Sequence, residues 1–333
     1  MEHSSRHYAL AACALLASGC AGSSVPATTQ ALTPSSSTNA HRARSWILPE
    51  AKTDKDLLYV ADPTQSPSVN GHIAIIAIHG LKYVEIGQIE DDNDPQGMTT
   101  DAAGNLYVTD IGVATEGPAT GEIKVYPKGS TSYSRLIVPT KWVPFDIAAG
   151  PDGTMYVANI APFASFSPGS VSIYPPNASQ PSRVLRLKNF QVDGITLHDS
   201  GPSIYISYQA EGASGNGAIA EFKNARGKAI QFGVNFPEPW GLLEDGNDNL
   251  LAADGSGIIE VYSEATKQLV QQIAVPTGAM FEAFNTKRTH LFVSNFDQVE
   301  VLSYPAGQVI GTINESWSKQ NYPTGVAYWP PPK

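Results

Sequence analysis

A short two-strand phrase recurs along the chain at intervals of 41 to 49 residues. Its clearest copy, residues 95–110, reads Pro-Gln-Gly-Met-Thr-Thr-Asp-Ala-Ala-Gly-Asn-Leu-Tyr-Val-Thr-Asp and predicts two short strands joined by a Gly-Asn turn. A repeat of about 45 residues built from short strands is typical of a β-propeller blade. The copies align on one aromatic or leucine position of the second strand: Tyr59, Tyr107, Tyr156, Tyr205, Leu251 and Phe292.

Two more segments complete each repeat. A third segment alternates between apolar and polar residues, as in residues 123–126 and 171–174, which predicts a half-buried strand. A fourth segment, such as residues 183–187 with its outward arginines, predicts an edge strand. The repeats therefore predict an all-β fold made of four-stranded blades.

The two ends of the repeat region complement each other. Residues 57–62 read as a second strand with no first strand before it, whereas residues 323–328 read as a first strand with nothing after it. Pairing them would let the carboxyl-terminal strand close the first blade, which removes the exposed sheet edges that invite aggregation. We therefore expect a six-bladed β-propeller over residues 51–333.

The amino terminus predicts export. Residues 9–17 are almost wholly apolar, too short to span a bilayer that needs roughly 20 helical residues. The sequence Leu-Ala-Ser-Gly-Cys then ends at Cys20 and resembles a bacterial lipobox, in which the cysteine is lipidated. We expect a signal peptide at residues 1–19 and, at residues 20–50, a lipid-anchored Cys20 followed by a flexible tether rich in Ser, Thr, Pro and Ala. The alternative is an ordinary secretory signal with Cys20 incidental.

Charge and cysteine content restrict the partners. The 31 acidic residues against 21 basic ones give a net charge of −10, which disfavours nucleic acid. The two cysteines lie at or before the expected cleavage site, so a disulfide framework is excluded. We expect a monomer in the bacterial cell envelope, periplasmic or associated with the outer membrane, that contacts the membrane through its lipid anchor alone.

The residues that enter the first strands mark a candidate binding site. In a propeller these strands line the central channel, and the loops before them share one face with the loops between second and third strands. Three aromatics beside three acids would suit an apolar or cationic ligand such as a peptide, a glycan or a small molecule. The same aromatics could instead fill the channel as core. The candidate residues are Gln96, Phe145, Asp146, Asp193, Trp240, Phe281 and Glu282.

The loops on this face differ in length. Those at residues 63–71, 111–120, 160–169 and 209–217 are long, whereas those at residues 255–257 and 296–298 are short. We expect an uneven cup, although neutral drift in loop length would give the same pattern.

Residues 97–110 above all resemble NHL repeats and the wider group of six-bladed propellers with gluconolactonase/SMP-30-like and strictosidine-synthase-like proteins. The resemblance covers about residues 55–330. It implies the fold, but the group contains both binding proteins and enzymes.

Gluconolactonase-like propellers hold a divalent ion by a Glu, an Asn and an Asp at the first-strand entries. Here Asp193-Gly194 is similar to the Asp-Gly entry, but Thr324 stands where the Glu is needed and the Asn is missing. Asp146 and Glu282 are shifted by one residue, which reverses the direction of a strand side chain. We therefore assign no metal ligand, and a divalent cation such as Ca²⁺ is expected only under an enzymatic interpretation.

Other catalytic signatures are missing from the sequence. It has no Gly-x-Ser-x-Gly elbow. The histidines His41, His72, His79, His198 and His290 are scattered without metal spacing. Residues 245–249, Asp-Gly-Asn-Asp-Asn, read as a hairpin turn.

We therefore predict a binding or scaffold protein that uses its central cup, with no catalytic residue assigned. The alternative is a hydrolase or lyase, lactonase-like and metal-dependent, with Asp193 in the site.

Overall fold

The computed structural model describes residues 45–63, 71–91, 94–112, 121–139, 141–160, 168–187, 190–199, 201–210, 217–232, 237–295, 297–314 and 323–332. All of them belong to one compact unit, Arg42–Lys333. The expected signal peptide and Cys20 lie outside the described residues, as does most of each long loop of the expected cup.

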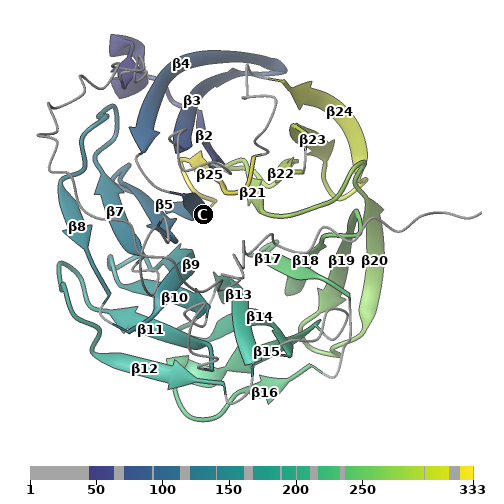
Figure 1. Cartoon of the computed structure of the whole chain (residues 1–333). Helices are drawn as coiled ribbons and strands as arrows, with labels where there is room; N and C mark the ends of the chain where they lie inside the picture. Colours follow the sequence, from purple (N-terminus) through teal and green to yellow (C-terminus); the bar gives the residue numbers. More distant parts are fainter. Residues whose placement is uncertain are drawn as a thin grey trace, which may run out of the picture. The chain divides into compact units, whose positions relative to one another are not determined.

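Six antiparallel sheets surround a common centre, and each begins with an inner strand and ends with an outer one (Figure 1). The fold is a six-bladed β-propeller, as the repeats predict. Blade one contains β25 (Val326–Trp329), β2 (Leu57–Asp62), β3 (Gly71–His79), β4 (Lys82–Asp91) and β1 (Trp46–Ile47).

The other five blades each follow the chain from the inner to the outer strand. Blade two has β5 (Pro95–Thr100), β6 (Leu106–Asp110), β7 (Glu122–Tyr126) and β8 (Arg135–Ile137). Blade three has β9 (Val143–Ala149), β10 (Met155–Ile160), β11 (Ser170–Tyr174) and β12 (Arg183–Arg186). Blade four has β13 (Phe190–Leu197), β14 (Ile204–Ala210), β15 (Gly217–Phe222) and β16 (Ile230–Gln231). Blade five has β17 (Pro239–Glu244), β18 (Asn249–Asp254), β19 (Ile258–Ser263) and β20 (Leu269–Ala274), and blade six has β21 (Glu282–Phe284), β22 (His290–Ser294), β23 (Val299–Ser303) and β24 (Gln308–Ile313).

The second strands are apolar on both faces because each face packs on a neighbouring blade. In β2, Tyr59 packs in a cluster with Val108 of blade two, whereas Val60 packs in a cluster with Phe292 of blade six. Successive side chains of a strand point to opposite faces, so a run of apolar residues serves both contacts. The hydrophobic core is therefore a ring of clusters between blades.

The carboxyl-terminal strand closes the first blade, which confirms the expected closure. β25 pairs antiparallel with β2, and the register sets Leu57 against Trp329 and Val60 against Val326. Tyr328 ties the junction further, because its hydroxyl donates to Asp56 Oδ1 at 2.8 Å and its ring stacks on Phe292.

Two elements of the described structure precede or overlap residue 51. Trp46 and Ile47 form β1 on the outer edge of blade one, and a 3-10 helix follows at Pro49–Lys52. β1 pairs with β4 beside Gly87, where a Cβ would lie only 3.0 Å from the Ile47 side chain. The expected boundary between tether and propeller lies within the 3-10 helix.

Residues 245–249 form the hairpin turn between β17 and β18, as predicted. Asp245 Oδ1 accepts hydrogen bonds from the backbone N–H groups of Asn247 and Asn249 at 2.7 and 3.1 Å. No helix within the described ranges is long and apolar enough to cross a bilayer.

Candidate ligand-binding site

Each first strand runs from the face with the long loops, called here the loop face, to the face with the β-hairpin turns, called the hairpin face. Phe145, Trp240 and Phe281 stand at the loop-face end of the first strands of blades three, five and six. The rings meet across the channel, with centroid separations of 5.8 Å for Phe145–Trp240, 6.0 Å for Phe145–Phe281 and 6.3 Å for Trp240–Phe281.

These three residues are named the aromatic floor. Phe145 and Phe281 are buried, whereas Trp240 is only partly buried. Tilted and edge-on ring pairs at such distances contribute about 0.5–1.5 kcal/mol each beyond simple burial. The floor fills the channel beneath the loop face and leaves part of the Trp240 side chain accessible.

Gln96 and Thr324 occupy the equivalent positions in blades two and one. Both are buried. The Gln96 amide donates to Asp94 Oδ1 at 2.8 Å, and the Thr324 hydroxyl donates to the Pro95 carbonyl oxygen at 3.1 Å. The Thr324 hydroxyl therefore links the strand entries of blades one and two, whereas the Gln96 amide binds within the entry of blade two.

One step further along the first strands, glycine predominates because neighbouring strands approach closely there. At Gly325 a Cβ would lie 1.9 Å from the backbone oxygen of Gln96, and at Gly194 it would lie 2.1 Å from the backbone oxygen of Trp240. A side chain at either position would have to push the adjacent blade outward. The same close approach occurs at Gly97 and Gly241.

The two remaining positions of this ring hold the acids Asp146 and Glu282. Asp146 bridges blades three and four, because its Oδ1 accepts from the Ile147 N–H at 2.8 Å and its Oδ2 from the Ile195 N–H at 2.9 Å. Burial raises the pKa of Asp146 to about 7, although the two backbone N–H donors act to lower this pKa.

Glu282 is buried, and neither of its carboxyl oxygens makes a hydrogen bond of normal geometry to the described residues. Its carboxyl group lies against Gly241, where a Cβ would stand 2.5 Å from Glu282 Oε2. Burial and the negative charge of Asp146 raise the pKa of Glu282 well above its ordinary value. Its environment therefore favours the uncharged form of the Glu282 carboxyl group.

Asp193 lies in β13, where the pairing with β14 is irregular between Val192 and Gly194. Its Oδ1 accepts from the Gln191 amide at 2.8 Å, and burial raises the pKa of Asp193 to about 7. Its Oδ2 is buried without a hydrogen-bond partner of normal geometry in the part of the chain described.

A cavity of about 110 Å³ lies in the channel on the hairpin side of the aromatic floor. Its lining consists mainly of residues that follow the strand entries, among them Asp146, Glu282, Thr99, Leu243 and Tyr328. Asp193 is not part of the lining. The structure therefore brings Asp146 and Glu282 to one cavity, and that cavity is separated from the loop face by the floor.

Three of the Asp and Asn residues that end the second strands bind loop or turn backbone: Asp110, Asp254 and Asn295. Asp110 Oδ1 accepts from the N–H groups of Asp94 and Gly112 at 3.0 and 2.9 Å. Asp254 and Asn295 accept from backbone N–H groups in the same way. Asp254 and Asn295 therefore shape the two short turns of the loop face.

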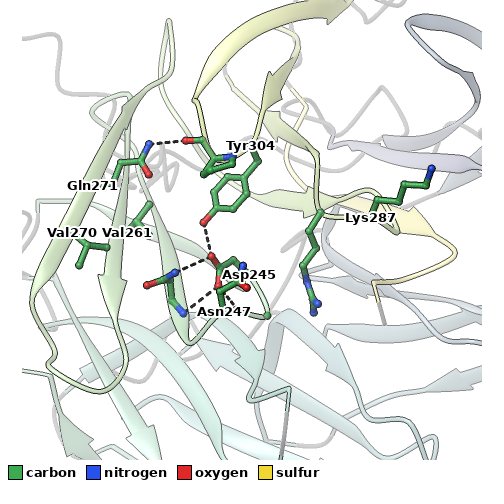
Figure 2. Close-up of a pocket in the computed structure, with 11 residues that line it drawn as sticks. Asp245, Asn247, Val261, Val270, Gln271, Lys287 and Tyr304 are labelled. Atoms are coloured by element: carbon green, nitrogen blue, oxygen red, sulfur yellow. Dashed lines mark hydrogen bonds between the residues drawn. The ribbon is translucent and has the colours of Figure 1, made fainter.

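A larger groove opens on the hairpin face between blades five and six, with a volume of about 580 Å³ (Figure 2). Tyr304 donates its hydroxyl hydrogen to Asp245 Oδ2 at 2.7 Å across this groove, and Gln271 donates to the Pro305 carbonyl oxygen at 2.8 Å. Sequence reasoning missed this groove, because its walls come from turns of two different blades.

No protein-family model matches the chain, and no curated protein sequence matches it. Solved structures do. A chain of the crystal structure of the nidogen/laminin complex is 13% identical, with a TM-score of 0.59 over 82% of this chain and 98% of that one. The WD40 β-propeller domain of Doa1 is 11% identical, with a TM-score of 0.53 over 79% of this chain and 84% of that one. Likeness at such low identity shows the propeller fold alone, so membership of the NHL or SMP-30 groups stays a prediction.

Proposed function

We propose that this chain is an exported, lipid-anchored β-propeller that binds a peptide, a glycan or a small ligand on its loop face. The aromatic floor carries the proposal. It fills the channel immediately below that face and presents a partly exposed tryptophan. Tryptophan is enriched among the residues that dominate binding energy at protein interfaces.

The surroundings of Trp240 suit a binding role. A Cβ on Gly255 would lie 2.6 Å from Glu238 Oε2 and 2.9 Å from the Trp240 indole nitrogen, so all three groups lie together beside a short turn. An aromatic face beside a carboxylate offers apolar contact, a hydrogen-bond donor and negative charge within a small area. A ligand with a cationic or hydroxyl-rich edge matches this set.

The likeness to a chain of the nidogen/laminin complex is compatible with this proposal. That crystal structure is of a complex, so a propeller of similar fold is found there in an assembly. The low identity means that no contact residue is transferred to this chain.

The enzymatic alternative depends on Asp193. A buried carboxyl group with a raised pKa is a common feature of catalytic sites, and Asp193 Oδ2 has no hydrogen-bond partner of normal geometry among the described residues. Against this alternative, Asp193 does not line the channel cavity that Asp146 and Glu282 share. Binding on the loop face is therefore the better-supported proposal.

The binding proposal is tested by presenting the full chain, in detergent, to a random-peptide phage library and a glycan array. We expect ligands of one class to bind the wild-type chain and to bind Trp240→Leu at least tenfold more weakly. Tyr133→Leu is the matched control, because Tyr133 is an exposed aromatic on the hairpin face. Equal loss of binding in both variants, or no loss in Trp240→Leu, would refute a site on the aromatic floor.

The anchor is tested by cell fractionation. We expect Cys20→Ser to abolish incorporation of radiolabelled palmitate and to move the protein from the membrane to the soluble fraction. Cys13→Ser should leave both unchanged, because Cys13 lies within the expected signal peptide. Membrane retention of Cys20→Ser would mean that the anchor was assigned incorrectly.

A further inference from the structure

Three turns of blades four and five meet on the hairpin face and bring four potential metal ligands together. His198 follows β13, Glu244 ends β17, Asp248 belongs to the turn between β17 and β18, and Glu264 follows β19. One ligand atom from each of these side chains lies within 4.8 Å of the corresponding atoms of the other three. We propose that His198, Glu244, Asp248 and Glu264 form a Zn²⁺ site that joins blade four to blade five.

Neighbouring groups already hold these side chains in place. His198 Nε2 lies 3.1 Å from Glu264 Oε2, and the Tyr205 hydroxyl donates to the same oxygen at 2.8 Å. The Glu264 N–H donates to the Asp248 carbonyl oxygen at 2.9 Å, which ties the two turns of blade five together. Supporting hydrogen bonds of this kind orient the ligands at metal sites.

The second observation is an unsatisfied oxygen within the cluster. The Glu264 side chain is only 6% exposed, and its Oε1 has no hydrogen-bond partner in the described part of the chain. Leaving a buried carboxyl oxygen without a partner costs free energy that a bound cation would recover.

The charge balance also favours a cation. Three carboxyl groups converge here, and the nearby Arg288 guanidinium already contacts the Asp199 carboxylate. The cluster is therefore short of positive charge.

The donor set favours zinc among common divalent ions. Ca²⁺ and Mg²⁺ prefer shells of six or more oxygens, whereas Zn²⁺ accepts a mixed tetrahedral set of imidazole nitrogen and carboxylate oxygen at about 2.0–2.2 Å. A tetrahedron of that size separates its ligand atoms by about 3.4 Å. Asp248 is exposed, so its side chain has room to move inward. Four protein ligands would fill the shell, which is typical of a structural site.

The site is tested with the full chain, purified without a histidine tag and stripped with EDTA. We expect calorimetric titration with ZnCl₂ to show one ion per chain, thermal unfolding to shift upward, and Co²⁺ to give the visible absorption of a tetrahedral complex. In Glu264→Gln, which keeps the side-chain shape, zinc affinity should fall at least a hundredfold. His79→Gln is the matched control, because His79 is exposed and far along the chain from the cluster.

Glu264→Gln must melt like the wild-type chain in EDTA for its loss of zinc to be interpreted, and Glu244→Gln provides an independent second variant. Zinc binding of wild-type strength in both variants would overturn the proposal. So would a wild-type chain that binds no zinc, or that binds Ca²⁺ in preference to Zn²⁺.

Discussion

A chain that lacks residues 320–333 should lose its cooperative thermal transition and collect in the insoluble fraction. The deletion removes β25, so the inner strand of blade one is lost and the edge of β2 becomes exposed. Val326, Ala327 and Tyr328 are buried, and burial of each large apolar side chain contributes about 1.5–3 kcal/mol.

The deletion also breaks the contacts that join blade one to its neighbours. The Thr100 hydroxyl donates to the Tyr328 carbonyl oxygen at 2.6 Å, and the Tyr328 ring stacks on Phe292 with centroids 5.4 Å apart. Because a domain is stable by only about 5–15 kcal/mol in total, losing this strand should exceed the margin.

Circular dichroism during heating measures this prediction, with a chain that ends at residue 330 as the control. The control keeps the whole of β25 and should melt near the wild-type temperature. A deletion variant that still melts cooperatively within a few degrees of the wild-type chain would contradict closure by the carboxyl-terminal strand.

The second large effect is a loss of stability as the pH rises. Burial raises the pKa values of Asp146 and Asp193 from 3.8 to about 7. Between these values the folded chain binds more protons than the unfolded chain, so the free energy of unfolding falls as the pH rises from about 4 to about 7. At about 1.4 kcal/mol per unit of pKa, each carboxyl group would contribute about 4 kcal/mol to this fall.

Urea unfolding at pH 5 and pH 8, in the presence of EDTA, measures the effect. We expect a lower midpoint at pH 8, and a smaller difference in Asp193→Asn, which keeps the acceptor for Gln191 but carries no charge. Asp152→Asn is the control, because Asp152 is exposed and Thr154 lowers its pKa. A midpoint that rises between pH 5 and pH 8 would show that these acids are not held in uncharged form.

The blades and the closing strand could be predicted because both follow from the repeated order of strands and turns in the sequence. The alternation of apolar and polar residues, together with the turn residues, defines the strands of a blade. Residues 57–62 read as a second strand without a first strand, which indicated that another segment of the chain had to pair with them. β1 escaped prediction because Trp46 and Ile47 make only a two-residue strand, which is too short to show a period.

The site was predicted less completely, since a sequence gives the order of residues along a strand but not how far they reach towards the channel axis. Alignment of the repeats placed Phe145, Trp240 and Phe281 at equivalent positions of the first strands. It left open whether their rings contact one another or leave an open cup in the channel. The structure shows that they meet. The one-residue shift of Asp146 and Glu282 was visible in the sequence, and it places them below the aromatic floor.

The cluster around His198 was missed because its members are far apart in the chain. A signal for it was nevertheless available. His198 and Asp245 each follow directly after the first strand of a blade, so turns of blades four and five had to lie side by side. Comparing equivalent turns, rather than searching for local spacing, would have found the cluster.

We propose that a ligand binds above the aromatic floor on the loop face and not in the channel beneath it. The dissociation constant of the tightest peptide or glycan from the screen, measured for wild type, Trp240→Leu and Thr99→Leu, tests this most directly. Thr99 lines the cavity on the hairpin side, so Thr99→Leu narrows the cavity without touching the floor. We predict at least tenfold weaker binding for Trp240→Leu and unchanged binding for Thr99→Leu. Weaker binding for Thr99→Leu with unchanged binding for Trp240→Leu would place the ligand in the channel and contradict binding on the loop face.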